Sequence, residues 1–277
     1  MSVNTKINVF KYKDYRDFLR DWYESCKSSR AGFSFRTFSK RAGFTSPNFF
    51  KLVMDGERNL TEDSLQKFLV GLKLNKQEQE FFTNLVFYNQ AHDHDDKDRY
   101  YQNMMRSRQF SQLRAIEKQQ YEYYSTWYHP VVRELVVSKF YDGTSESIAN
   151  RLSPEVTVEQ VARSIELLAN LGFIERVGKK GWKQSSTLVS TGDEVQSVAI
   201  FKYHKNLLDL SKSILDRVPS GRRDISTMTL GIKKERVSEL KKKVQEFRKE
   251  ILKLVSEDVE PEDVVQLNIQ LLPLTRE

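Results

Sequence analysis

Residues 35–72 are the stretch that most limits how this chain can fold, because they place three short apolar helical patterns next to one another. In the first pattern, apolar residues recur at three- and four-residue steps as far as Ala42. Gly43 follows, and glycine readily adopts the left-handed backbone that ends a helix. We therefore predict a first helix over Phe35–Ala42.

The next pattern begins with Thr45-Ser46-Pro47, which is typical of a helix start. A hydroxyl group there caps free N–H groups, and proline is tolerated in the first turn. A second helix is predicted over Pro47–Met54, with Phe49, Leu52 and Val53 facing inward and Asn48, Lys51 and Phe50 facing outward. After a loop, Thr61 is predicted to cap a third helix whose core side chains are Leu65, Phe68, Leu69 and Leu72.

This order of helix, glycine turn, hydroxyl-capped helix and glycine-containing loop is a helix-turn-helix pattern. It resembles the helix-turn-helix of phage-repressor-like regulators. The span from Gly43 to Gly56 is one residue longer than in those proteins, which lengthens the second helix or alters its exit. The resemblance implies DNA binding, and the alternative is a helical packing module that touches no DNA.

The candidate DNA contacts come from the polar residues of this stretch. Asn48 and Lys51 are expected to reach base edges in the major groove, because Asn commonly reads adenine and Lys guanine. Side chains flanking the second helix are expected to hold phosphates: Lys40, Arg41, Ser46 and Arg58.

The charge of the chain favours an anionic partner, with nucleic acid as the first candidate. The formal net charge is +7 and the isoelectric point is near 9.2. Residues 1–90 hold fifteen Lys and Arg against ten Asp and Glu, so they carry +5 of that charge. The basic excess therefore coincides with the helix-turn-helix pattern.

Length and composition predict a cytoplasmic protein of two or three domains. The chain has 277 residues, and no apolar run approaches the roughly 18 residues that a membrane span requires. The N-terminal residues lack the apolar core of a secretory signal. Cys26 is the only cysteine, which fits a reducing compartment. No membrane partner is expected.

We predict a mainly α fold with a minor β part. An N-terminal helix-turn-helix bundle precedes a central winged helix and C-terminal helices with a small sheet. The predicted domains are a DNA-binding domain (1–91), a linker with a connecting helix (92–130), a winged-helix-like domain (131–192) and a C-terminal α/β dimerisation or sensing domain (193–277).

The winged-helix prediction depends on a capped helix followed by a hairpin. Thr157 caps a helix over Val158–Leu171, and two short strands follow with Lys179 and Lys180 at their turn. This helix exposes two acids against one arginine, which suits a phosphate-lined groove poorly. We therefore expect a scaffold or dimer element, and the two lysines offer at most a secondary nucleic-acid contact.

The C-terminal part reads as strand, helix, strand. Residues 225–232 and 264–273 alternate like strands, and the helix between them, Lys233–Val255, carries a heptad seam. The two strands are expected to form a parallel pair under the helix. Because a two-stranded sheet is marginal alone, more strands are expected from the wing or from a second copy, and a homodimer is favoured.

Signals for catalysis or for a metal are weak. Two histidines and several aspartates between His92 and Asp98 resemble metal ligands, but no second cluster of fixed spacing accompanies them. A solvated linker explains that composition as well. The sequence contains no phosphate-cradling glycine loop and no Ser/His/Asp set, so neither an enzyme nor a cofactor is expected.

Several blocks along the chain resemble a bacterial family first catalogued as hypothetical proteins in Fibrobacter and abundant in Bdellovibrio-type bacteria. These blocks are YRDFLRDWYE, FSFRTFSKRAGFTSPNFFKLVMDGERNLT, QYEYYSTWYHPVVREL, RDISTMTLGI and VVQLNIQLLPLT. The resemblance implies a cytoplasmic regulator of transcription with a C-terminal domain of unknown function, and it supplies no ligand or catalytic residue.

Two functions follow from the sequence. The first is a homodimeric transcriptional regulator that reads double-stranded DNA and leaves room for an unidentified small-molecule effector. The alternative is a protein-interaction or small-ligand sensor module whose helix-turn-helix units serve as packing surfaces. Salt-sensitive binding to duplex DNA separates the two, because only the first predicts it.

Overall fold

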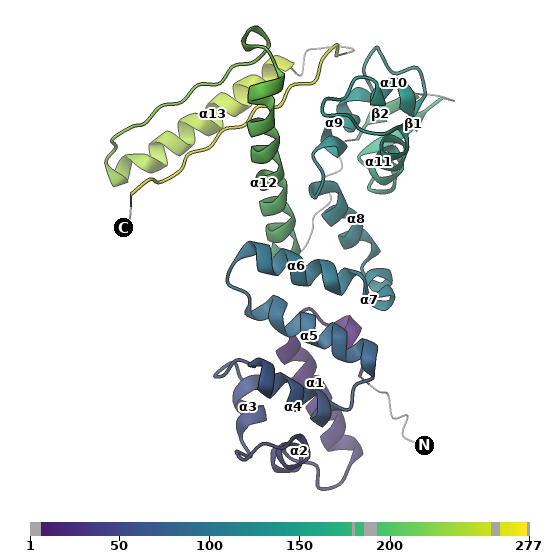
Figure 1. Ribbon diagram of the computed structural model, residues 1–277, viewed down its shortest axis with the longest axis vertical. Helices are drawn as coiled ribbons and strands as arrows, with labels where there is room; N and C mark the ends of the chain where they lie inside the picture. Colours follow the sequence, from purple (N-terminus) through teal and green to yellow (C-terminus); the bar gives the residue numbers. More distant parts are fainter. Residues whose placement is uncertain (1–6, 179–180, 186–192, 256–260, 276–277) are drawn as a thin grey trace. The chain divides into compact units, whose positions relative to one another are not determined.

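The computed structural model describes residues 7–178, 181–185, 193–255 and 261–275 (Figure 1). Helices predominate, and the described residues contain one two-stranded antiparallel sheet, as the sequence predicted. The chain divides into two compact units, Met1–Lys118 with Gly192–Phe201, and Gln119–Thr191 with Lys202–Glu277. Each unit is described separately below.

The first unit is entirely helical in its described residues. Its elements are η1 (Val9–Lys11), α1 (Tyr15–Ser29), α2 (Phe35–Ala42), α3 (Phe49–Met54), α4 (Glu62–Leu72), α5 (Lys76–Gln90), α6 (His94–Met105) and α7 (Arg108–Leu113), followed by the start of α8 (Ala115–Tyr124). α4 and α5 begin with capping boxes, at Thr61 with Ser64 and at Asn75 with Glu78. The Thr61 cap was predicted from the sequence.

The core of the first unit is a cluster of aromatic rings that contact one another edge to face as well as stacked. Phe50 is fully buried, and its ring centroid lies 4.4 Å from that of Phe38 and 5.4 Å from that of Phe68. The prediction that Phe50 faces outward is therefore wrong. Because α3 begins at Phe49 rather than at Pro47, Phe50 and Val53 form the inward face one turn apart.

Residues 92–118 also differ from the expected linker and single connecting helix. α6 already begins at His94, where Asp93 caps it, and it packs against α5 with Tyr100 stacked on Phe87 at 5.3 Å. Ser107 and Arg114 separate α6, α7 and α8. The acidic residues after His92 thus form the first turn of a helix, which their charge stabilises.

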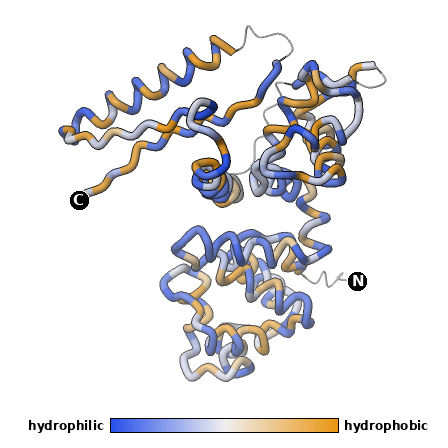
Figure 2. Tube along the Cα trace, turned by 45° about the horizontal axis from the view of Figure 1, so that its top comes forward, coloured by the Kyte–Doolittle hydropathy of each residue, from blue (hydrophilic) through white to orange (hydrophobic). Residues whose placement is uncertain are grey.

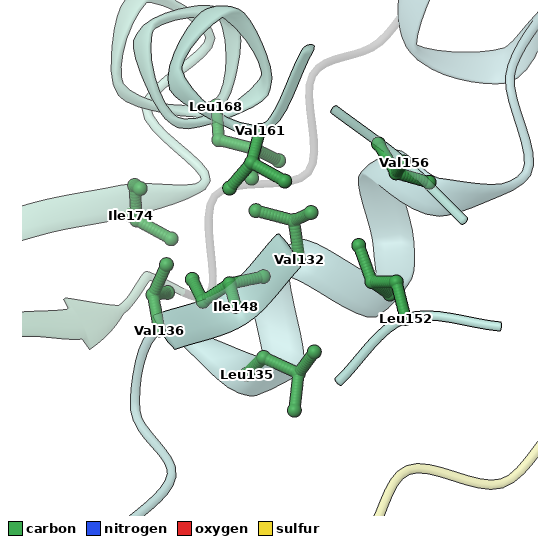
Figure 3. Close-up of a cluster of buried hydrophobic side chains, with 9 residues drawn as sticks. All are labelled: Val132, Leu135, Val136, Ile148, Leu152, Val156, Val161, Leu168 and Ile174. Atoms are coloured by element: carbon green, nitrogen blue, oxygen red, sulfur yellow. The ribbon is translucent and has the colours of Figure 1, made fainter. Parts of the chain in front are cut away.

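The second unit contains three helices followed by a hairpin, the winged-helix order. These elements are α9 (Tyr128–Leu135), α10 (Ser145–Ala149), α11 (Val158–Asn170), β1 (Ile174–Val177) and β2 (Gly181–Gln184). The strands pair antiparallel, with Ile174 opposite Gln184 and Val177 opposite Gly181. Val132, Val161 and Ile174 belong to the buried cluster that joins helices and hairpin (Figure 3).

A buried polar pair lies beside this cluster. His129 Nδ1 and Ser164 Oγ are 2.8 Å apart, and both side chains are buried. Burial, and secondarily the charge of Arg163, lowers the pKa of His129 to about 4, so the imidazole stays neutral near pH 7. The Tyr123 ring stacks on the His129 imidazole with centroids 6.3 Å apart, so Tyr123 and His129 pack together in the core of this unit.

The chain continues into α12 (Asp193–Arg217), which spans the boundary of the two units, then η2 (Ser220–Arg222), η3 (Lys234–Arg236) and α13 (Val237–Val255). The predicted C-terminal strands are not formed: residues 223–233 and 263–274 have no strand assignment. Both segments run extended alongside α13, in the same direction, with many apolar positions (Figures 1 and 2).

Among the residues that the structure describes, none of the helices combines the length and the apolar composition that crossing a bilayer requires.

Candidate nucleic-acid interface

The turn between α2 and α3 is fixed by backbone hydrogen bonds. Gly43 ends α2 with a φ of 76°, a left-handed conformation that glycine adopts without strain. Its N–H and that of Phe44 both donate to the Ser39 carbonyl. The buried Ser39 hydroxyl donates to the Pro47 carbonyl at 3.2 Å, which ties the turn to the preceding helix.

The predicted second helix starts two residues late. Pro47 and Asn48 form a turn, and Asn48 stands at the N-cap position of α3 without a side-chain capping bond. α3 has only six residues, so the additional residue between Gly43 and Gly56 has not lengthened the helix. The Asn48 side chain therefore projects from the turn before α3 and is exposed.

α1 holds the far end of α3 in place with two arginines. Arg16 Nε donates to the Val53 carbonyl at 3.1 Å, and Arg16 Nη2 donates to Asn59 Oδ1 at 2.8 Å. Arg20 Nη2 donates to the Met54 carbonyl at 3.0 Å. The last carbonyls of a helix carry partial negative charge, so these cations stabilise the end of α3.

The exit loop closes on the same end of α3. The N–H groups of Glu57 and Arg58 both donate to the Leu52 carbonyl, at 2.9 and 3.1 Å. Gly56 has a φ of 85°, which this tight reversal requires. The Arg58 side chain consequently extends from a loop that is anchored at both ends.

Five of the six predicted DNA-binding side chains are exposed around α3, namely Lys40, Ser46, Asn48, Lys51 and Arg58. Lys40 lies in the last turn of α2, and Lys51 lies on α3 itself. Within the described part of the chain, no ion pair or side-chain hydrogen bond engages Lys40, Lys51 or Arg58. These cations are free to meet an anionic ligand.

Arg41 is placed differently from the other predicted contacts. Its guanidinium carbon lies 5.6 to 5.8 Å from the ring centroids of Trp22, Phe33 and Phe38. Nε and Nη2 are buried, and burial lowers the pKa of its guanidinium. Arg41 therefore packs between aromatic rings by cation–π contact, and the structure does not bring it to the surface with Lys40.

Sequence reasoning missed three arginines. Arg16 and Arg20 lie on one face of α1 at an i, i+4 spacing, a signal in the sequence that could have indicated a shared contact. Arg36 lies on α2 one turn before Lys40, is exposed, and has no ion pair among the described residues. It extends the free basic surface from α3 along α2.

The winged helix offers a less basic surface. On α11 the predicted outward residues are all exposed, namely Glu159, Gln160, Arg163, Glu166 and Asn170. Arg163 is 3.4 Å from the Glu122 carboxylate, so the single cation of this face already has an acidic neighbour. Lys179 and Lys180, the predicted secondary contacts, lie outside the described residues.

In the part of the chain that the structure describes, no group of three or more His, Cys, Asp or Glu side chains is placed so that it could hold a metal ion, and this includes the histidine-rich stretch. His94 stacks on Phe201 with ring centroids 4.2 Å apart. Asp93 accepts a hydrogen bond from the Asp96 N–H as the cap of α6.

Comparisons with known proteins give one match. Residues 107–274 match the model of a family described as a domain of unknown function, DUF4423. This match covers more than half of the chain and begins after the helix-turn-helix region. No curated protein and no solved structure matches.

Proposed function

Because the chain belongs to the DUF4423 family, whose domain has no known function, we propose a function that rests on its N-terminal unit: the protein is a DNA-binding regulator of transcription. In this proposal α3 enters the major groove and α2 crosses the phosphate backbone. The observation that carries it is a set of exposed cations around α3 that have no ion-pair partner among the described residues, namely Arg36, Lys40, Lys51 and Arg58.

The roles of the side chains follow from their positions. Lys51 and Asn48, on α3 and in the turn before it, are assigned to base edges. Lys40, Ser46, Arg58 and Arg36 are assigned to phosphates, which set orientation and supply sequence-independent affinity. Arg41 is assigned to positioning, because its stacked guanidinium helps fix α2 against the core.

The positioning of α3 supports this reading. Direct readout requires a helix whose side chains are held in a defined orientation, since hydrogen bonds to base edges tolerate little displacement. Two arginines of α1 and the loop after α3 engage the carbonyls of its last three residues, Leu52, Val53 and Met54. A packing module alone gives no reason to leave its flanking cations unpaired.

Fluorescence anisotropy with short labelled duplexes of random sequence, across a salt series, tests the proposal. Wild-type affinity is expected to fall linearly on a plot of log affinity against log salt concentration. Arg58→Ala is expected to weaken binding and to lower the salt slope by about one. Lys51→Ala is expected to weaken binding to a selected sequence about tenfold.

Arg108→Ala is the matched control, because Arg108 is exposed and lies on α7, outside the helix-turn-helix. It removes the same charge, so a general electrostatic effect would lower affinity as much as Arg58→Ala does. Equal losses in the two variants, or no duplex binding by the wild type at low salt, would contradict the proposal. The second outcome favours a protein-interaction module.

A further inference from the structure

Exposed apolar side chains gather at the C-terminal end of the described chain. Fourteen of the twenty-three exposed large hydrophobic residues lie beyond residue 224. Met228 is 81% exposed, Val265 84% and Leu274 81%, and all three lie in the two extended segments, residues 223–233 and 263–274. A concentration of exposed apolar side chains of this kind marks a site of association.

The backbones of both segments are also unpaired. Between Asp224 and Ile232, and between Asp263 and Leu274, no backbone–backbone hydrogen bond joins either segment to another described residue. The two segments run in the same direction along α13 (Figures 1 and 2). Extended apolar edges with free N–H and C=O groups are templates for pairing with another strand.

We propose that a second copy of this chain covers this surface by strand pairing. The first segment (residues 223–233) pairs antiparallel with the second segment (residues 263–274) of the second copy, and two-fold symmetry repeats the contact. Because both segments of one chain run in the same direction, a strand of the second copy inserted between them is antiparallel to both. The result is a four-stranded antiparallel layer.

The side-chain pattern of the two segments fits one register. If residue numbers of opposed positions sum to 497, apolar side chains of the first segment face apolar side chains of the second. The opposed pairs are then Ile232 with Val265, Leu230 with Leu267 and Met228 with Ile269, while Thr229 faces Asn268 and Thr227 faces Gln270. A slip of one residue in either direction would place Leu230 and Met228, the central apolar positions of the first segment, opposite Asn or Gln side chains.

Charged residues at the ends of the two segments favour a second copy of this chain as the binding partner. The same register brings the end of the first segment, with Lys233 and the adjoining Lys234, next to Glu262 and Asp263 at the start of the second segment, and all four residues are exposed. Within one chain, Glu262 pairs with Lys139, and Asp263 lies 3.9 Å from Arg222. The first segment is basic at both ends, so antiparallel pairing with its own copy would oppose like charges.

The proposed dimer rests on the proposed function in one respect: a dimeric regulator presents two helix-turn-helix units, and these bind the two half-sites of an operator. Its test uses no DNA. Failure of strand pairing therefore leaves the DNA-binding result intact, and failure of DNA binding leaves the oligomeric state intact.

Sedimentation velocity of the full chain over a concentration series measures the association. The wild type is expected to be a dimer, and Leu267→Asp is expected to shift it to monomer at the same concentration. Leu113→Asp is the matched control, because Leu113 on α7 is 54% exposed and Leu267 is 52% exposed. A monomeric wild type, or equal behaviour of the two variants, overturns the proposal.

Charge reversal tests the pairing itself without touching the apolar face. One variant carries Lys233→Glu with Lys234→Glu, and the other carries Glu262→Lys with Asp263→Lys. Each variant alone is expected to be monomeric, because like charges then oppose one another in both equivalent contacts. An equimolar mixture is expected to form heterodimers, because every contact is matched again.

The mixture also separates this pairing from other dimers. If each charge-reversed variant dimerises as well as the wild type, these ends do not meet and the proposal is overturned. If the mixture stays monomeric although circular dichroism shows both variants folded, the proposed pairing of first with second segment is also overturned.

Discussion

At the scale of single residues, Gly71 shows how tightly α2 and α4 pack. A Cβ atom built on Gly71 would lie 2.6 Å from both Cε2 and Cζ of Phe38 and 3.0 Å from Cβ of Ala42. Phe38 is fully buried and in contact with other rings, so it cannot move aside. The glycine therefore sets the distance between the two helices.

We expect Gly71→Ala to lower the free energy of unfolding of the first unit by about 1–3 kcal/mol, the usual effect of overpacking. Alanine has a helix propensity about 1 kcal/mol more favourable than that of glycine, but the cost of overpacking is expected to exceed this gain. Urea denaturation measures it. Val70→Ala, at an exposed neighbouring position, should stay within about 0.5 kcal/mol, and a Gly71→Ala protein as stable as wild type would refute the close contact.

Residues also show where sequence reasoning ends. The periodicity near Ala42 and Leu72 predicted which side chains of α2 and α4 are buried, because these helices present one apolar stripe. The periodicity failed for Phe50. Phe49 and Phe50 are adjacent, so the sequence alone did not show which of the two faces the core. Arg41 could not be assigned either, because its aromatic neighbours come partly from α1 and the loop after it.

At the scale of elements, α3 is too short to be stable by itself. Six residues form few intrahelical hydrogen bonds, and isolated helices shorter than about 12 residues are marginal in water. Its position therefore depends on Phe50 and Val53 in the core and on the arginines of α1. Substitutions on α1 should therefore alter the position of α3 at the candidate interface.

We expect Arg16→Ala to accelerate amide hydrogen exchange in residues 52–58, because it removes the hydrogen bonds to Val53 and Asn59. Exchange in α4 should be unchanged. DNA affinity should fall several-fold, corresponding to about 1 kcal/mol for a lost hydrogen bond. Arg106→Ala, at an exposed position after α6, serves as the control, and identical exchange in both variants would argue against this role for Arg16.

Elements with a cap and one apolar stripe were predicted well. α2 and α11 begin and end within one residue of their predicted bounds, and α4 begins directly after its predicted cap, Thr61. Two kinds of element were not. The stretch after His92 became a helix because packing on α5 adds to weak local signals. The C-terminal segments stay unpaired because no backbone of the described residues is hydrogen-bonded to them, and the pattern of apolar residues within a segment does not reveal whether such a partner exists.

At the scale of the whole molecule, the two compact units should respond to different perturbations. His129 lies in the second unit with a pKa near 4, well below the ordinary 6.5 of histidine. The unfolded chain therefore takes up a proton below pH 6.5 that the folded unit excludes. Stability is full above that pH and declines as the pH falls toward 4.

Between pH 7 and pH 5 this single group should cost the second unit about 2 kcal/mol of unfolding free energy. Calorimetry of the wild type should show one transition that moves to lower temperature over this pH range. His129→Gln should flatten that dependence, since glutamine does not titrate. Gly71→Ala should shift the other transition instead. If acidification moved both transitions equally in wild type and His129→Gln, another group would be responsible.

The hold of α1 on α3 has a consequence for engineering. On the proposed function, a designer who wishes to change the DNA sequence that the protein binds would ordinarily transplant the six residues of α3 from one relative into another. Here the geometry of those residues is partly encoded some thirty positions earlier, by Arg16 and Arg20. A graft that carries α3 without these two arginines of α1 would transfer the sequence of α3 but not the contacts that fix the orientation of its side chains.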